Sequence, residues 1–239
     1  MKIHRVDNQR VHEFLSSHFS SPTHWPDWNL LIMKYFNTDF YYLGASERGE
    51  LKGVCPVHKI RERKYLYRLQ SGQFHLIPNG GWIFSEPQVL SKENFPTNWK
   101  TSFQIFSLPL VKEFNVLGVK HHNQLKKTLI IDLEKSLEDI WSEDINSKRR
   151  NMIRKSEKEG IAIRQVRTYQ ELEDFYDLYI QASRRFTSHQ LSLEFFRDMF
   201  FYTSNIQLDI FAAYQDGRQL ANVGIVSDKN YSIYWLGNN

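Results

Sequence analysis

Cysteine is nearly absent from this chain of 239 residues, since Cys55 is the only one. A single cysteine excludes an internal disulfide and a cysteine-based metal cluster, and such usage is typical of a reducing compartment. Long apolar runs are lacking too, so the sequence predicts neither a secretory signal at its N-terminus nor a membrane-spanning helix. We therefore expect a soluble chain located in the cytoplasm.

A large excess of one charge is also missing. Lys and Arg number 31 against 27 Asp and Glu, which gives a formal net charge of +4. This mildly basic balance favours anionic ligands but is too weak to predict DNA binding, and it leaves peripheral contact with an acidic membrane surface open. With 41% hydrophobic and 24% charged residues, the chain has the composition of a globular protein with a buried core.

Several catalytic signatures are absent as well. The histidines show no His-Glu-x-x-His or Cys/His spacing, so no metal site is predicted. The chain contains neither a Gly-x-Ser-x-Gly elbow nor a Gly-x-x-x-x-Gly-Lys-Ser/Thr loop, which removes the strongest signals of a serine hydrolase and of a P-loop nucleotide enzyme. The remaining functional signal is the placement of the cations.

The cations are concentrated in residues 147–158, which include Lys148. Arg150, Arg154 and Lys158 stand at i, i+4 and i+8, so a helix would present them as one row. Cations four residues apart repel each other by roughly a few tenths of a kcal/mol, so a bound phosphate or carboxylate would explain the row better than helix stability does. A solvated face, partly neutralised by neighbouring glutamates, is the competing interpretation.

Three helices are predicted in the second half of the chain. The first begins at a capping box, Ser136-x-x-Asp139, and continues through the basic segment to Gly160. The second begins at Thr168-x-x-Glu171, and Ser192 caps the third, which precedes a strand at about 206–214. The apolar positions are Leu137, Ile140, Trp141 and Ile145 in the first helix, Leu172, Phe175, Tyr179, Ala182 and Phe186 in the second, and Phe195, Phe196, Met199 and Phe200 in the third.

A strand–turn–strand pattern that occurs twice in the sequence bears on the architecture. Residues 40–59 and 208–229 both have the pattern of an apolar strand, a charged turn containing glycine, and a second apolar strand. Gly49 and Gly217, in these turns, are 168 residues apart (217 minus 49). The pattern favours two similar lobes, although a hairpin of this kind also arises by chance.

In the first half, a glycine pair and an aromatic cluster attract attention. Gly80 and Gly81 precede a short apolar strand and either make a turn or let a substrate approach the backbone closely. Trp25 and Trp28 either stack on a sugar or lie buried at an interface between lobes.

The segment from Lys127 to Val166, followed by a helix and the strand pair at 208–226, resembles the Fem-type (FemAB) aminoacyltransferases and the related GNAT-like acyltransferases of surface-polymer assembly. In that family a strand ending in Asp-Leu precedes a Trp-containing helix, a Lys/Arg-rich segment ending in Gly, and another strand. The residues that match this order are Asp132-Leu133, Trp141, Arg150, Arg154 and Gly160.

The resemblance implies an α/β fold of mixed sheets in two GNAT-like lobes, at residues 1–126 and 127–239. Family members continue beyond the strand at residues 231–236, so the second lobe is expected to be incomplete at its C-terminus. The implied activity is transfer of an aminoacyl or acyl group to an amine of a peptidoglycan or other surface-polymer precursor.

The resemblance also assigns site residues. Arg185, with Arg184 as the alternative, matches an arginine that contacts the diphosphate of a nucleotide-linked muropeptide, although cations at a helix C-terminus also stabilise the helix dipole. Lys148, Arg150 and Arg154 would supply further positioning charge. The acceptor-groove candidates are Asn79, Gly80, Gly81 and Trp28.

No general base is singled out, because Asp132 and Asp209 are expected to be structural at strand ends. No bound cofactor is expected either. The chain lacks the Arg/Gln-x-x-Gly-x-Gly/Ala loop that cradles the CoA pyrophosphate, which favours aminoacyl-tRNA as the acyl donor, or no activity. A CoA-dependent N-acyltransferase acting on a sugar or amino acid, and an inactive truncated binding module, remain the alternatives.

Overall fold

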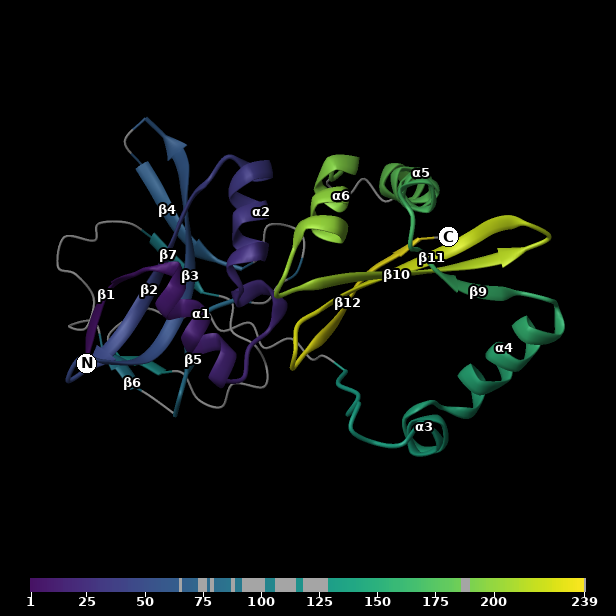
Figure 1. Cartoon of the computed structure of the whole chain (residues 1–239), viewed down its shortest axis with the longest axis horizontal. Coiled ribbons are helices and arrows are strands. Elements are labelled where there is room, and N and C mark those ends of the chain that lie inside the picture. Colours follow the sequence, from purple (N-terminus) through teal and green to yellow (C-terminus); the bar gives the residue numbers. More distant parts are fainter. Residues whose placement is uncertain are drawn as a thin grey trace.

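The computed structural model describes residues 1–64, 66–72, 77, 80–86, 89–91, 102–105, 115–117, 129–185 and 190–238. It contains two main sheets with helices packed on and between them (Figure 1). The mixed α/β class predicted from the sequence is confirmed. Asn79, Phe186 and the predicted lobe boundary at residues 126–127 lie outside the described residues, and the two-lobe division stays a prediction.

The larger sheet is built from the first half of the chain. It has six strands in the order β1-β2-β3-β4-β7, with β5 also paired to β3. Neighbours are antiparallel except β4 and β7, and β6 and β8 form a separate parallel pair. The strands are β1 (Lys2–Val6), β2 (Asp39–Glu47), β3 (Glu50–Arg63), β4 (Leu66–Ser71), β5 (Ile83–Phe84), β6 (Val89–Ser91), β7 (Ser102–Ile105) and β8 (Asn115–Leu117), and the helices are α1 (Asn8–Ser17), the 3-10 turn η1 (Pro22–His24) and α2 (Pro26–Phe36).

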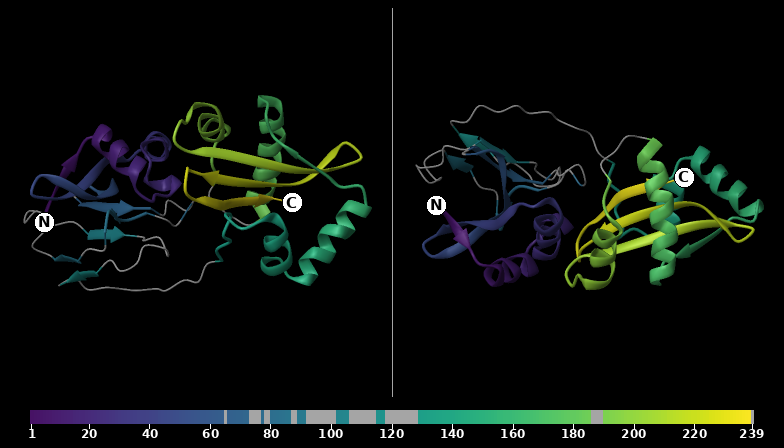
Figure 2. Two further views of the ribbon diagram at one scale, coloured as in Figure 1. Left: turned by 60° about the horizontal axis from the view of Figure 1, so that its bottom comes forward. Right: turned by 90° about the horizontal axis from the view of Figure 1, so that it is seen from above.

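The smaller sheet is antiparallel throughout, in the order β12-β11-β10-β9. Two helices pack on one of its faces, as the view from above in Figure 2 shows. Its strands are β9 (Ala162–Gln165), β10 (Gln207–Gln215), β11 (Arg218–Ser227) and β12 (Ser232–Asn238), and its helices are α5 (Tyr169–Arg185) and α6 (Leu193–Tyr202). The remaining helical elements are α3 (Leu137–Asp139), the π-helical turn η3 (Ile140–Asp144) and α4 (Ser147–Lys158).

The two hairpins that carry the repeated pattern, β2–β3 and β10–β11, have matching geometry. In each turn both central residues have positive φ: 51° and 87° at Arg48 and Gly49, and 51° and 77° at Asp216 and Gly217. Positive φ at both positions is the geometry of a type I′ hairpin turn. Four residues before each glycine the strand pairing shifts register, at Ala45 and at Ala213. Each hairpin also follows a strand and two helices, so the order of elements before the hairpin is repeated as well.

The helices α5 and α6 form as predicted, because the expected side chains cap their N-termini with hydrogen bonds. The backbone NH of Thr168 donates to Glu171 Oε2 at 3.0 Å, and the Glu171 NH donates back to Thr168 Oγ1 at 3.3 Å. Ser192 accepts from the NH of Phe195. The apolar faces of both helices are buried; α6 packs against β10, and α5 packs against α6, β11 and β12.

The first predicted helix is wrong in its extent. The helical segment breaks at Ile145, whose backbone is extended, and Asn146 begins a new helix by accepting from the NH of Arg149. The predicted apolar face is not buried either, since the side chain of Leu137 is 86% exposed. The strand expected to end at Asp132-Leu133 does not form in residues 129–132. We call residues 129–160, which contain α3, η3 and α4, the arm.

One hydrophobic cluster connects the two sheets. Trp28 of α2 and Trp235 of β12 meet edge to face with ring centroids 5.9 Å apart, and Phe195 of α6 packs 6.2 Å from Trp235. The cluster includes buried residues from α1, α2, α5, α6 and β10. Polar contacts follow the same junction: Asp198 of α6 accepts from Tyr35 of α2 at 2.7 Å. The two sheets therefore share a core.

No helix in the described part of the chain is both long enough and apolar enough to cross a membrane.

Candidate functional site

Two arginines of the arm, Arg150 and Arg154, make their contacts within the arm itself. Arg150 Nη1 donates to the carbonyl oxygens of Trp141 and Ser142, both at 3.0 Å, and also to that of Ile145. These carbonyls lie at the end of a helical turn, where they lack partners in the helix. The Arg154 guanidinium lies 5.7 Å from the centre of the Trp141 ring, within the range of a cation–π contact. Both arginines thus fasten η3 to α4, while Lys148 is exposed.

The acceptor-groove candidates lie in the interior. Trp28 is buried against Trp235, and Gly80 and Gly81 are buried as well. A Cβ on Gly80 would lie 2.6 Å from the backbone nitrogen of Gly72, so this glycine permits close packing of two backbone segments. In this structure these described residues are buried and therefore do not line an open groove.

A buried polar network occupies the same part of the molecule. Ser21 Oγ lies 2.9 Å from His24 Nδ1, and His58 contacts Thr38 Oγ1 and Asn29 Oδ1, also at 2.9 Å. Burial lowers the pKa of His24 to about 4 and that of His58 to about 3. The Ser21–His24 pair has the composition of an activated nucleophile, but both residues have no exposed surface, so a substrate cannot reach them here.

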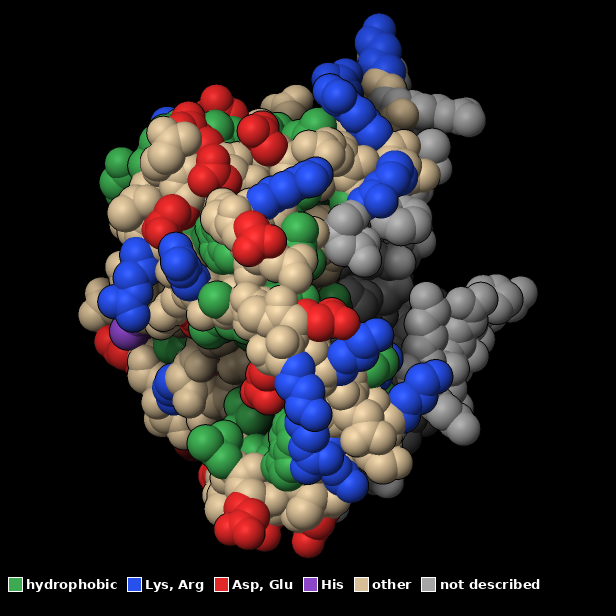
Figure 3. Space-filling model, turned by 90° about the vertical axis from the view of Figure 1, so that its right-hand side faces the viewer, with side chains coloured by type: hydrophobic (Ala, Val, Ile, Leu, Met, Phe, Trp, Pro, Cys, Tyr) green, Lys and Arg blue, Asp and Glu red, His purple; other side chains and the backbone are tan. Residues whose placement is uncertain are grey.

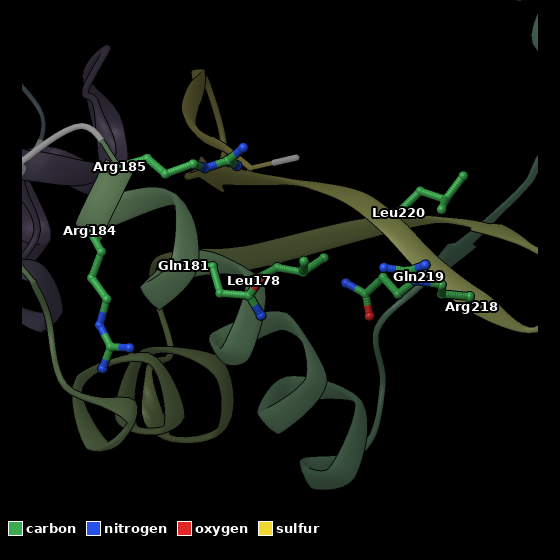
Figure 4. A pocket seen from close by; sticks show the side chains of 7 residues that line it. All are labelled: Leu178, Gln181, Arg184, Arg185, Arg218, Gln219 and Leu220. Carbon is green, nitrogen blue, oxygen red and sulfur yellow. The ribbon is translucent and has the colours of Figure 1, made fainter.

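The predicted Arg184 and Arg185 line an open pocket of about 450 Å³. The pocket lies between the C-terminal end of α5 and the start of β11 (Figure 4). In Figure 4 the two arginines leave α5 in different directions, and Gln219 extends from β11 toward the helix. The lining residues are Leu178, Gln181, Arg184, Arg185, Arg218, Gln219 and Leu220.

The charged side chains that line this pocket in the described part of the chain are all cationic. Three of its described lining residues are arginines and none is acidic. The Nε2 atom of Gln219 is buried and has no hydrogen-bond partner among the described residues. An unpaired buried donor costs about 1–3 kcal/mol, which a bound acceptor would recover. The helix dipole of α5 explains cations at Arg184 and Arg185, but it does not explain Arg218, which comes from a strand.

Sequence reasoning missed five of these residues: the polar Gln181, Arg218 and Gln219, and the apolar Leu178 and Leu220. Gln181 stands three and four residues before the two arginines, so helical spacing places it beside them. Arg218 directly follows Gly217 of the hairpin turn, and only the fold shows that this turn leads to the end of α5.

Asp132 and Asp209, the two aspartates that we considered as general bases, accept hydrogen bonds from neighbouring groups. Asp209 Oδ1 accepts from the side-chain amides of Gln165 and Gln207, at 2.8 and 2.7 Å. Asp132 Oδ1 accepts from the backbone NH of Glu134 at 3.0 Å. Within the described ranges no group of three or more His, Cys, Asp or Glu side chains is placed to hold a metal ion.

The protein thus has a mixed α/β fold and a pocket whose described lining includes three arginines. Residues 110–216 match the model of the FemAB family. A crystal structure of FemX matches with a TM-score of 0.61 and 12% sequence identity, over 100% of this chain and 80% of that chain. No match was found among curated proteins. The match of residues 110–216, which is less than half of the chain, and the fold shared with FemX support a Fem-type assignment.

Proposed function

We propose that this chain transfers an aminoacyl or acyl group to an amine of a peptidoglycan precursor or of another surface-polymer precursor. Its pocket at α5 and β11 would bind the anionic group of that precursor. The observation that carries the proposal is that Arg185 and Arg218, from separate elements, line one pocket, whose lining also includes Gln219 with its unpartnered Nε2. The match of residues 110–216 to the FemAB family model supports the reaction class.

The pocket residues would act by positioning. Arginine forms two parallel hydrogen bonds to a phosphate, which fixes its orientation as well as its place. With the precursor held, its amine attacks the carbonyl carbon of an activated ester, a C–N bond forms, and the C–O bond to the leaving alcohol breaks. The proton lost by the amine passes to the leaving oxygen or to water, since none of the described pocket residues is a carboxylate or histidine. Aminoacyl-tRNA is the proposed donor, and acyl-CoA is the alternative.

Arg150 and Arg154 have a different role in this proposal. Their contacts with the backbone of η3 and with Trp141 hold the arm in shape. Arg185 and Arg218 would therefore bind the anionic group of the substrate. Arg150 and Arg154 would influence substrate binding only indirectly, through the shape of the arm.

The test is binding of a nucleotide-linked muropeptide to the purified chain, measured by calorimetry. Arg185→Ala and Arg218→Ala should each weaken binding by at least about tenfold, because hydrogen bonds to charged groups contribute about 1.5–3 kcal/mol. Arg164→Ala is the matched control, since Arg164 is an exposed arginine of β9 that lies over Tyr214 and outside the pocket.

Three outcomes would contradict the proposal. The first is equal loss of muropeptide affinity in the Arg164→Ala control. The second is binding of acetyl-CoA but not of the muropeptide, which would move the activity to the CoA-dependent class. The third is no binding of muropeptide, acetyl-CoA or tRNA, as expected of an inactive module.

A further inference from the structure

A tyrosine of β10 holds the glutamine that lines the pocket at α5 and β11. Tyr214 and Gln219 are partners in the β10–β11 pairing, and the Tyr214 hydroxyl donates to Gln219 Oε1 at 3.4 Å. In Figure 4 the Gln219 side chain extends from β11 toward α5. The oxygen and the nitrogen of a carboxamide point in different directions, so a contact that fixes Oε1 also fixes where Nε2 points.

A β-bulge puts Gln219 in this position. The pairing of the two strands passes from Ala213 with Ala221 directly to Tyr214 with Gln219, so Leu220 has no partner on β10. Successive side chains of a regular strand point to opposite faces, whereas a bulge bends the strand and redirects them. The successive residues Gln219 and Leu220 accordingly both line the pocket.

The first hairpin shows that this backbone does not require a tyrosine and a glutamine. The hairpin β2–β3 has positive φ at the same two turn positions and the same register shift. Its residues at the positions of Tyr214 and Gln219 are Ser46 and Leu51, which also pair with each other and lie 168 residues earlier (214 minus 46 and 219 minus 51). The polar pair of the second hairpin therefore calls for another explanation than the shape of the turn.

The unpartnered nitrogen of Gln219 points to a ligand. Its Nε2 atom is buried and has no hydrogen-bond partner within the described ranges. Buried donors without a partner are rare in native proteins, and each needs a specific reason. Because the charged residues described in the pocket lining are arginines, an anion with oxygen lone pairs would accept from them and from the amide at once.

Positive charge alone does not set the pocket apart from the surface around it. Figure 3 views the molecule from the end that carries the β10–β11 turn, and Lys and Arg side chains extend over most of the height of this face, with Asp and Glu between them. A selective site needs donors that are also held in a fixed direction. Gln219 meets this condition through its contact with Tyr214.

We propose that Tyr214 is a positioning residue of the pocket: its hydroxyl holds the Gln219 carboxamide so that Nε2 donates to an oxygen of the bound anion. This inference rests on the proposed function, in which the same pocket binds the anionic group of the precursor. Without the hydroxyl the carboxamide is free to rotate and to turn Oε1, an acceptor, toward the anion. Tyr214 would thus affect binding only through Gln219.

The experiment measures binding of inorganic pyrophosphate to the full chain by calorimetry. Gln219→Leu should weaken binding by about tenfold, because it removes a hydrogen bond to a charged group. Tyr214→Phe keeps the ring and should weaken binding by roughly threefold to tenfold, because the amide is then no longer held. Tyr169→Phe is the matched control, since Tyr169 is an exposed tyrosine at the start of α5 and outside the pocket lining.

A double-mutant cycle separates positioning from a general structural role. In the Gln219→Leu background, Tyr214→Phe should cause no further loss, since there is no amide left to hold. In the Gln219→Lys background it should likewise have no effect, because an ammonium group has donors only. A structural role of Tyr214 would lower the affinity equally in all three backgrounds. Equal thermal midpoints would confirm that each variant remains folded.

The inference is overturned by additive losses in the cycle, by an equal loss in Tyr169→Phe, or by a parent chain that does not bind pyrophosphate. Its failure is distinguishable from that of the proposed function. Pyrophosphate binding that is coupled through Tyr214 and Gln219, without muropeptide binding, would refute the proposed function alone. Muropeptide binding that depends on Arg185 but is unchanged in Tyr214→Phe would refute this inference alone.

Discussion

Two histidines, His24 and His58, are enclosed in the polar network beside α2, and burial lowers their pKa to about 4 and about 3. In the unfolded chain a histidine titrates near 6.5. Between these values the unfolded state binds more protons than the folded state, so protonation favours unfolding. The stability that depends on the neutral rings is therefore fully present above pH 6.5 and is lost as the pH falls toward 4 and below.

This predicts a loss of roughly 3 kcal/mol in the free energy of unfolding between pH 7.5 and pH 4 from His24 alone. Urea titrations at several pH values would measure it. The variant His24→Gln should flatten the pH dependence, whereas His12→Gln, at an exposed position of α1, should leave it as it is. If the free energy of unfolding of His24→Gln depended on pH as it does in the parent chain, the attribution of this dependence to His24 would be wrong.

Individual cations were the part of the site that the sequence could partly predict. Arg185 was expected at a ligand site from the family resemblance, and it lines the pocket. Arg150 looked equivalent, but its three carbonyl acceptors exist only because the chain turns at Ile145. Arg218 could not be placed from spacing, because the hairpin brings it to α5 across 33 residues of sequence (218 minus 185).

At the scale of elements, the arm depends on Arg150. Removing this side chain leaves the carbonyl oxygens of Trp141, Ser142 and Ile145 without its guanidinium, so η3 should open more often. We expect Arg150→Ala to speed amide hydrogen exchange in residues 137–145 by at least about fivefold, with α5 unaffected.

Arg149→Ala is a suitable comparison, since Arg149 is exposed on the outward side of the same helix. Faster exchange in both variants alike would indicate that helix propensity, and not the contact with η3, sets the opening. Equal exchange in Arg150→Ala and the parent chain would show that the three contacts contribute nothing.

The sequence predicted α5 and α6 well because their signals are local. A capping box and a period of three and four residues act within one helix, and tertiary packing then agrees with them. It failed between α3 and α4 because Asn146 was not recognised as a cap in the middle of a helical pattern. A strong N-cap after an apolar turn can end one helix and begin another, and periodicity alone does not distinguish the two cases.

At the scale of the whole molecule, Asp198 connects the two halves. Burial raises the pKa of its carboxyl, but hydrogen bonds from Lys34 and Tyr35 of α2 and from Arg197 outweigh burial and hold it at about 2. Because the folded pKa lies below the unfolded value of 3.8, this stability is present above pH 3.8 and is lost as the pH falls toward 2.

We expect Asp198→Asn to lower the free energy of unfolding by roughly 1–3 kcal/mol at pH 7, with the exposure of Lys34 keeping the value modest. Thermal unfolding followed by tryptophan fluorescence would measure the change, because Trp28 and Trp235 meet at the same junction. Asp209→Asn, on β10, provides the comparison. A variant as stable as the parent would mean that the shared apolar core alone holds the halves together.

The matching hairpins β2–β3 and β10–β11 bear on how the chain reaches this structure. Each is closed by a two-residue turn, so its strands pair between near neighbours in the sequence and can form within microseconds. The contact between Trp28 and Trp235 joins residues 207 positions apart (235 minus 28) and requires closure of a far longer loop. We therefore expect two early local nuclei and one late step in which the halves meet, so that mutations at Trp235 slow folding less than they speed unfolding.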